Sequence, residues 1–77
     1  MMRRFQLVRH EDVYGASGVG IVAEGVQFWT GQCVMCWLSE TSSVTIHPSI
    51  DTLQAVHCHG GRSVVVWLDP EEEVCHD

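Results

Sequence analysis

Cysteine and histidine residues in two short stretches are the side chains of this sequence best suited to chemistry. Cys33 and Cys36 are spaced as Cys-x-x-Cys, and the run His57-Cys58-His59 comes directly before two glycines. Thiolates and imidazoles are ligands that zinc prefers in tetrahedral protein sites. A metal-site hypothesis follows, with the four ligands Cys33, Cys36, His57 and His59.

Each stretch also has a purely structural interpretation. Zinc-binding Cys-x-x-Cys pairs normally occupy a tight turn, whereas Cys33 and Cys36 fall in a predicted strand, where residues three apart point to opposite faces. Small thiols fit such a strand as ordinary core side chains. Imidazoles at the end of a helix interact favourably with its dipole, which accounts for His57 and His59 without a metal. We therefore expect no cofactor and keep zinc as the alternative.

Catalytic chemistry has little support in the sequence. A cysteine nucleophile needs an imidazole beside it and an oxyanion site, and Cys58 has histidines only as neighbours in the chain. The segment GASGVG at 15–20 lacks the lysine of a phosphate-binding loop and the spacing of a dinucleotide-binding loop. A chain of 77 residues also leaves little room for a ligand pocket of about 300 Å³ or more. We predict that the protein is not an enzyme.

Short strands and one helix must position these residues. Apolar patterning predicts strands at residues 5–8, 19–29, 32–38, 44–47 and 62–68. Ser49 is a good N-cap for a helix over about residues 50–58, which the glycines at 60–61 would end. The order β-β-β-β-α-β predicts an α+β, mainly β fold, which is a small, strongly curled antiparallel sheet or open barrel with one short helix. We expect the last strand beside the first.

The strand patterns also predict which residues face the core. The apolar parity of residues 19–29 changes at Gly25, which predicts a β-bulge there. Residues 32–38 are apolar on both faces, which predicts a central strand covered on each side. Alternation in the next strand predicts that Val44 and Ile46 point inward.

Acidic charge is concentrated at the C-terminal end. The formal net charge is −6, and the last nine residues hold five acidic and no basic groups, which leaves four basic against five acidic groups in residues 1–68. Nucleic-acid binding needs clustered Lys and Arg, so this balance disfavours it. The pattern predicts one small β-rich domain at residues 1–69 and an acidic, frayed tail at 70–77.

The expected location is the bacterial cytoplasm. No stretch approaches the roughly 20 apolar residues of a membrane span. The first ten residues contain Arg3 and Arg4 but lead into no apolar run and no small-residue cleavage site, so we expect no signal peptide. A reducing compartment disfavours disulfides among the four cysteines.

Trp29 is the candidate protein-contact residue. It lies beside a predicted hairpin turn at Thr30-Gly31, on the parity opposite Phe28, so we expect it to be partly exposed. Exposed tryptophan is enriched at binding hot spots. The alternative is that Trp29 covers an open end of the barrel. A second copy of the chain, bound through an edge strand, is the other partner that we consider.

Three stretches together resemble a known group of proteins. They are GASGVGIVAEGVQF at 15–28, Trp37-Leu38, and HCHGGRSVVVWLD at 57–69. This combination resembles short proteins encoded by actinobacteria and the phages that infect them. Members usually carry other residues in place of Cys33, Cys36 and Cys58, which argues against a cysteine-based zinc site. The resemblance implies a source and a domain boundary, and it brings no activity with it.

The leading functional hypothesis is a non-enzymatic protein-binding module, encoded by a phage or mobile element and acting on a host protein. The first alternative is a small zinc-binding protein that uses the cysteine and histidine ligands. The second is an acidic decoy of a nucleic-acid-binding protein, which would use the acidic run at residues 71–73.

Overall fold

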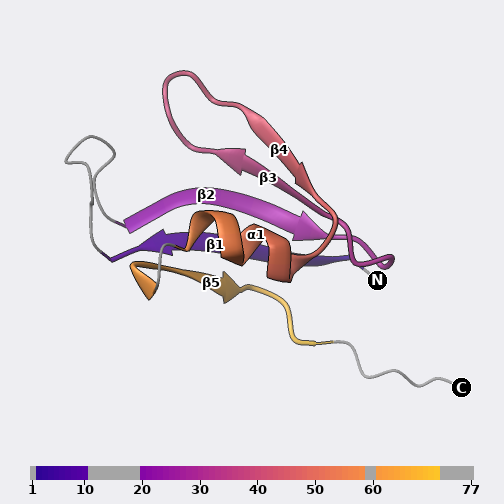
Figure 1. Ribbon diagram of the computed structural model, residues 1–77. Coiled ribbons are helices and arrows are strands. Elements are labelled where there is room, and N and C mark those ends of the chain that lie inside the picture. Colours follow the sequence, from indigo (N-terminus) through magenta and orange to yellow (C-terminus); the bar gives the residue numbers. More distant parts are fainter. Residues whose placement is uncertain (1, 11–19, 59–60, 72–77) are drawn as a thin grey trace, which may run out of the picture.

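The computed structural model describes residues 2–10, 20–58 and 61–71. They form one five-stranded antiparallel sheet and one helix, which lies across one face of the sheet (Figure 1). The elements in chain order are β1 (Arg3–Arg9), β2 (Gly20–Gln27), β3 (Cys33–Trp37), β4 (Val44–His47), α1 (Ile50–His57) and β5 (Ser63–Trp67).

The strand order in space is β4-β3-β2-β1-β5, so β5 lies beside β1 as the sequence predicts. The mainly β class and the order β-β-β-β-α-β are confirmed. The sheet is open, because β4 and β5 are its two edges and do not pair with each other. The predicted loop near residues 11–19, His59 and residues 72–77 of the predicted tail lie outside the described residues.

Helix α1 begins and ends close to where the sequence predicts. The side chain of Ser49 accepts a hydrogen bond from the Thr52 backbone N–H (3.1 Å), which satisfies one of the free donors of the first turn. Cys58 caps the other end, and its carbonyl accepts bonds from the N–H groups of Gly61 (3.0 Å) and Ser63 (3.1 Å). These bonds lead the chain directly from the helix into β5.

The hydrophobic core lies between α1 and one face of the sheet. Strand alternation places every second residue of the three central strands on this face. Leu53 from α1 packs against them. The fully buried apolar residues are Phe5, Leu7, Ala23, Cys33, Met35 and Leu53.

The predicted bulge in β2 exists, but not at Gly25. The register shifts where Leu7 pairs with Ala23 and the next residue of β1 pairs with Ile21, which makes Val22 the extra residue. At Gly25 the pairing is regular, and the glycine instead allows a close approach. A Cβ atom there would lie 2.5 Å from Cζ of Phe5. Glycine at position 25 therefore allows packing against the neighbouring strand and does not mark a change in the parity of β2.

The prediction that Val44 and Ile46 point to the core is wrong. Their exposed fractions are 59% and 72%. Pairing of Cys33 with His47 places His47, instead of the aliphatic residues, on the face beneath α1. Period-two alternation leaves open which face is buried, and pairing with β3 decides it.

The position predicted for β3 is only half correct. The strand is central, between β2 and β4. Its Cys33 and Met35 are buried, whereas the opposite face of the sheet is not covered by any helix or strand of the described residues. Apolar side chains on both faces of β3 therefore do not imply two covering layers within this part of the chain.

Candidate functional site

The turn between β2 and β3 presents Trp29 to solvent. The Phe28 N–H donates to the Gln32 carbonyl (2.8 Å), and the Gly31 N–H donates to the Phe28 carbonyl (2.9 Å), which closes the turn. Gly31 has φ = 98°, a conformation that glycine adopts without steric cost. Trp29 is 81% exposed, so the expected exposure beside a hairpin turn is confirmed. Its role in protein contact stays a prediction.

The segment after β5 is fixed to the start of β1 by Asp69. The Arg4 backbone N–H donates to Oδ2 of Asp69 (2.8 Å). The Arg4 guanidinium donates from Nε to Oδ2 (3.0 Å) and from Nη2 to Oδ1 (2.8 Å). The bonds to the Arg4 side chain contribute most and the bond to its backbone N–H comes next, and together they lower the pKa of Asp69 to about 2. The side-chain bonds also raise the pKa of Arg4.

Arg3 contacts both the ring of Trp67 and the segment after β5. Its guanidinium carbon is 3.7 Å from the ring centroid of Trp67, a cation–π contact. Its Nε donates to the Asp69 carbonyl (3.0 Å). Trp67 in turn meets Phe5 edge to face, with ring centroids 5.5 Å apart. The Arg3 side chain is therefore held in place from two sides.

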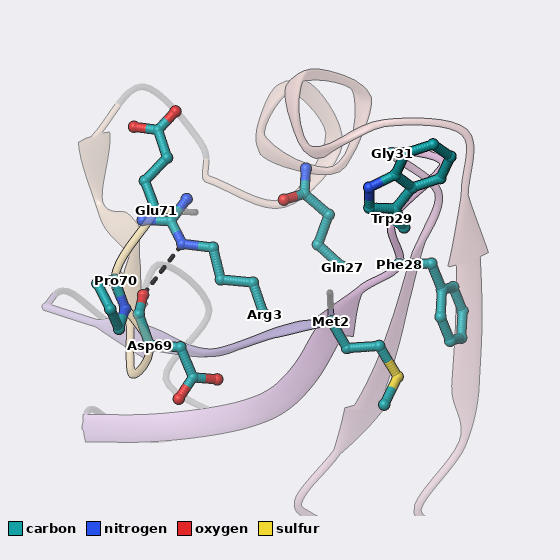
Figure 2. Close-up of a pocket in the computed structure, with 9 residues that line it drawn as sticks. All are labelled: Met2, Arg3, Gln27, Phe28, Trp29, Gly31, Asp69, Pro70 and Glu71. Atoms are coloured by element: carbon teal, nitrogen blue, oxygen red, sulfur yellow. Dashed lines mark hydrogen bonds between the residues drawn. The ribbon is translucent and has the colours of Figure 1, made fainter. Parts of the chain in front are cut away.

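The β2–β3 turn, the segment after β5 and the start of β1 line a groove of about 500 Å³. One wall is the aromatic turn after β2, the other is the acidic segment after β5, and Arg3 lies between them (Figure 2). The sequence-based expectation of too little room for a pocket is wrong, because the groove lies outside the core and is built at the end of the sheet. The lining residues are Met2, Arg3, Gln27, Phe28, Trp29, Gly31, Asp69, Pro70 and Glu71.

The lining is suited to binding. Trp29 and Phe28 offer aromatic surface for stacking, and the Gln27 amide and the Trp29 indole N–H are hydrogen-bond donors. Asp69 is a poor proton acceptor at neutral pH because its pKa is about 2 and Arg4 occupies both of its oxygens. The groove thus combines stacking surface, hydrogen-bond donors and charged groups, which are Arg3, Asp69 and Glu71.

The structure places the two candidate cysteine ligands on opposite faces of β3. Cys33 is fully buried on the core face, where its Sγ lies 3.6 Å from the Gly31 carbonyl oxygen. Cys36 lies on the other face, with its Sγ 3.3 Å from the Ser42 hydroxyl. β3 pairs with β2 and β4 without a bulge. Burial also raises the pKa of Cys33, which favours the neutral thiol over the metal-binding thiolate.

The candidate histidine ligands lie at the end of α1. The His57 ring is 5.1 Å from Trp37 and 5.2 Å from His47, centroid to centroid. His59 lies outside the described residues. Within the described part of the chain, no group of three His, Cys, Asp or Glu side chains is arranged to hold a metal ion. The four-ligand set as a whole therefore stays a prediction.

Sequence reasoning missed most of the groove. The sequence predicts no role for Arg3 and Asp69 beyond their charge, although it predicts that the first and last strands are neighbours. Antiparallel pairing of β1 with β5 brings the start of one beside the end of the other. That pairing, combined with two arginines before Phe5 and an acid after Leu68, is the signal that predicts the contact.

Comparison with known proteins gives a family. A family model described as Acb5 phage protein matches residues 2–69, which include every strand, the helix and both walls of the groove up to Asp69. Neither a curated protein nor a solved structure matches the chain. No helix among the described residues is long and apolar enough to span a membrane. Because the match extends over most of the sequence, the chain belongs to the Acb5 phage protein family.

Proposed function

We propose that this phage protein is a non-enzymatic protein-binding module that acts on a host protein, and that its groove binds an extended segment of that partner. The observation that carries the proposal is the 81% exposed Trp29 at the rim of a groove of about 500 Å³. A large apolar ring held in water on a closed turn gains free energy when a partner covers it, at roughly 25 cal/mol per Å² of apolar area.

Preorganisation supports the groove as a binding site. Both walls are fixed before a partner arrives: the turn by its backbone hydrogen bonds, and the opposite wall by the three bonds from Arg4 to Asp69. Ordering loops on binding weakens association, so walls that are already ordered favour affinity. Arg3 is likewise held on Trp67 and does not need to be reoriented.

The lining favours a partner segment that combines an apolar ring with a basic side chain. A proline or aromatic ring can stack on Trp29, while the indole and the Gln27 amide donate to the carbonyl groups of an extended backbone. Glu71 lies on the opposite wall, and the chain carries a formal net charge of −6. Both favour approach of a basic segment.

A display library of random peptides of about 12 residues, selected on the purified chain, tests this proposal. We expect enrichment of peptides that carry proline or an aromatic residue near Arg or Lys. Trp29→Ala should weaken a selected peptide at least about thirtyfold, because a central tryptophan contributes about 2 kcal/mol or more. Glu71→Lys should weaken it about two- to fivefold, as expected for an exposed ion pair.

Matched variants make this test specific. Val56→Ala removes an exposed apolar side chain on α1, outside the groove, and Glu40→Lys reverses an exposed charge outside it. Both should bind the peptide as the unchanged chain does. A peptide that binds Trp29→Ala as tightly as the unchanged chain, or a selection without the ring-and-base motif, contradicts the proposal.

We place this interaction in the cytoplasm of an actinobacterial host. The host range is supported by the resemblance of residues 15–28 and 57–69 to proteins of actinobacteria and their phages. Genomic position beside phage genes in an actinobacterial genome is the observation that checks the host range.

A further inference from the structure

The face of the sheet opposite α1 carries a second, independent surface, which we call the open face. Pairing in the sheet places one set of alternating residues on it, and most of them are aliphatic. No helix or strand among the described residues packs on this set. Its apolar members are Val8, Ile21, Val26, Val34, Cys36, Val44, Ile46, Val64, Val66 and Leu68.

Exposed aliphatic side chains lie toward both edges of the open face. Ile46 and Val44 on β4 are 72% and 59% exposed, and Val64, Val66 and Leu68 near the other edge are also exposed. A monomeric protein of this size seldom leaves so many neighbouring aliphatic side chains in water. This exposure matters more because the core beneath α1 is small. A chain of this length buries little apolar area by itself, so its folding free energy is limited.

Polar side chains interrupt the apolar surface near its centre. Gln6 pairs with Glu24, and Arg4 pairs with Val26 on the same face. These residues separate an apolar patch on β3 and β4 from another on β1 and β5. A covering partner must therefore present apolar surface on two sides and charge in the middle.

We propose that the open face binds the open face of a second copy of this chain, so that two sheets stack into a symmetric sandwich. A twisted sheet packs best on a surface of the same twist, and a second copy provides that surface. A two-fold axis along β2, the middle strand, places β3 and β4 of each protomer over the partner's β1 and β5. It also brings Glu24 of each protomer toward the partner's Arg4, since the two residues lie on adjacent strands near the centre. The apolar patches then meet apolar patches.

The electrostatics are compatible with this arrangement. Arg4 uses Nε and Nη2 for Asp69, so its Nη1 lies outside that ion pair. The Arg4 side chain is 66% exposed although it is paired. It can donate a hydrogen bond to a second carboxylate, that of Glu24 from the other protomer, and keep its ion pair with Asp69.

The size of the face predicts a dimer of modest affinity. Strand spacing of about 4.8 Å and rise of about 3.3 Å per residue give a face of roughly 24 by 17 Å. Two such faces bury about 1,000 Å² once side-chain relief is included, which is below the roughly 1,200 Å² of stable specific interfaces and in the range of weak, transient ones. We therefore expect dissociation in the micromolar range.

Sedimentation equilibrium of the full chain, in reducing buffer to keep Cys36 free, tests the proposal. The unchanged chain should reach twice its 8.6 kDa mass as concentration rises to about 500 µM. Ile46→Lys should raise the dissociation constant more than about tenfold, whereas Val56→Lys, which alters an aliphatic side chain that is 52% exposed on α1, should not. Circular dichroism confirms that each variant is folded.

A charge pair of variants tests the central contact. Glu24→Lys places a cation against the partner's Arg4 and should also raise the constant more than about tenfold, whereas Glu40→Lys, with the same change of net charge in the β3–β4 connection, should leave it unchanged. Mixing isotope-labelled and unlabelled protein should give intermolecular NOEs between methyl groups of Val26 and Val34. A monomer at about 500 µM, or a dimer that survives both Ile46→Lys and Glu24→Lys, overturns the proposal.

Discussion

Asp69 joins the end of β5 to the start of β1 through one carboxylate. Three hydrogen bonds from Arg4 stabilise its ionised form and hold its pKa at about 2. The same residue lines the groove, and its backbone carbonyl accepts a bond from Arg3. The Asp69 side chain therefore holds the groove wall opposite Trp29 and also links the end of β5 to the start of β1.

The pH dependence of folding should show this bond. Because the pKa of Asp69 in the folded chain lies below its ordinary value of 3.8, the pair stabilises the fold fully above about pH 4, and the stabilisation is lost as pH falls toward about 2. Asp69→Asn should lower the free energy of unfolding at pH 7 and flatten its decline between pH 4 and 2. Urea denaturation across that range measures the effect.

The control for this measurement is Glu40→Gln, which removes the same charge from an exposed connection. It should keep the decline between pH 4 and 2 seen in the unchanged chain. Equal profiles for Asp69→Asn and the unchanged chain would show that the ion pair does not contribute to folding.

Strand β2 is shaped by its neighbours at one glycine. Phe5 on β1 and the Val34 carbonyl on β3 both approach Gly25 so closely that a Cβ atom would lie 2.5 Å from each. One contact is with backbone, which cannot rotate away. The close packing of β2 against the Phe5 ring therefore depends on Gly25, which has no side chain.

Gly25→Ala should destabilise the fold by about 1–3 kcal/mol through overpacking. Urea denaturation at one fixed protein concentration measures this loss, since self-association changes apparent stability. The double variant with Phe5→Leu should lose less than the sum of the two single variants, because the shorter side chain removes part of the clash. A strictly additive or neutral result would mean that β2 shifts without cost.

Helix α1 and the sheet divide the described part of the molecule into three surfaces. α1 covers one face and completes the core, the groove occupies the end of the sheet where β1 and β5 meet the β2–β3 turn, and no described helix or strand covers the open face. Among the described residues, Arg4 and Asp69 connect the groove with the open face, because Arg4 belongs to the open face and Asp69 to the groove.

Apart from the contact between Arg4 and Asp69, the two proposed binding surfaces should act separately. Trp29→Ala should leave the dimer dissociation constant within about twofold, and Ile46→Lys should leave binding of a groove-selected peptide within about twofold, because Trp29 is not on the open face and Ile46 does not line the groove. Sedimentation and peptide titration of both variants measure this. Loss of both activities in either variant would indicate that dimer formation builds the groove or blocks it.

Local features of the sequence determined the elements and their order. Serine before a helical pattern, Gly31 in a tight turn and alternating apolar residues each act within a few neighbouring residues, so they can be read without the fold. The prediction of α1, of five strands and of β5 beside β1 was correct for this reason. The exposure expected for Trp29 followed from its place beside the turn.

Tertiary structure alone decided which face is buried and where the site lies. Alternation with period two is the same for both faces, so Val44 and Ile46 were predicted inward, and only pairing of Cys33 with His47 turns them outward. The bulge at Val22 and the groove between Trp29 and Asp69 likewise arise from contacts between strands that are distant in the chain. Such contacts depend on register and packing, which no local pattern encodes.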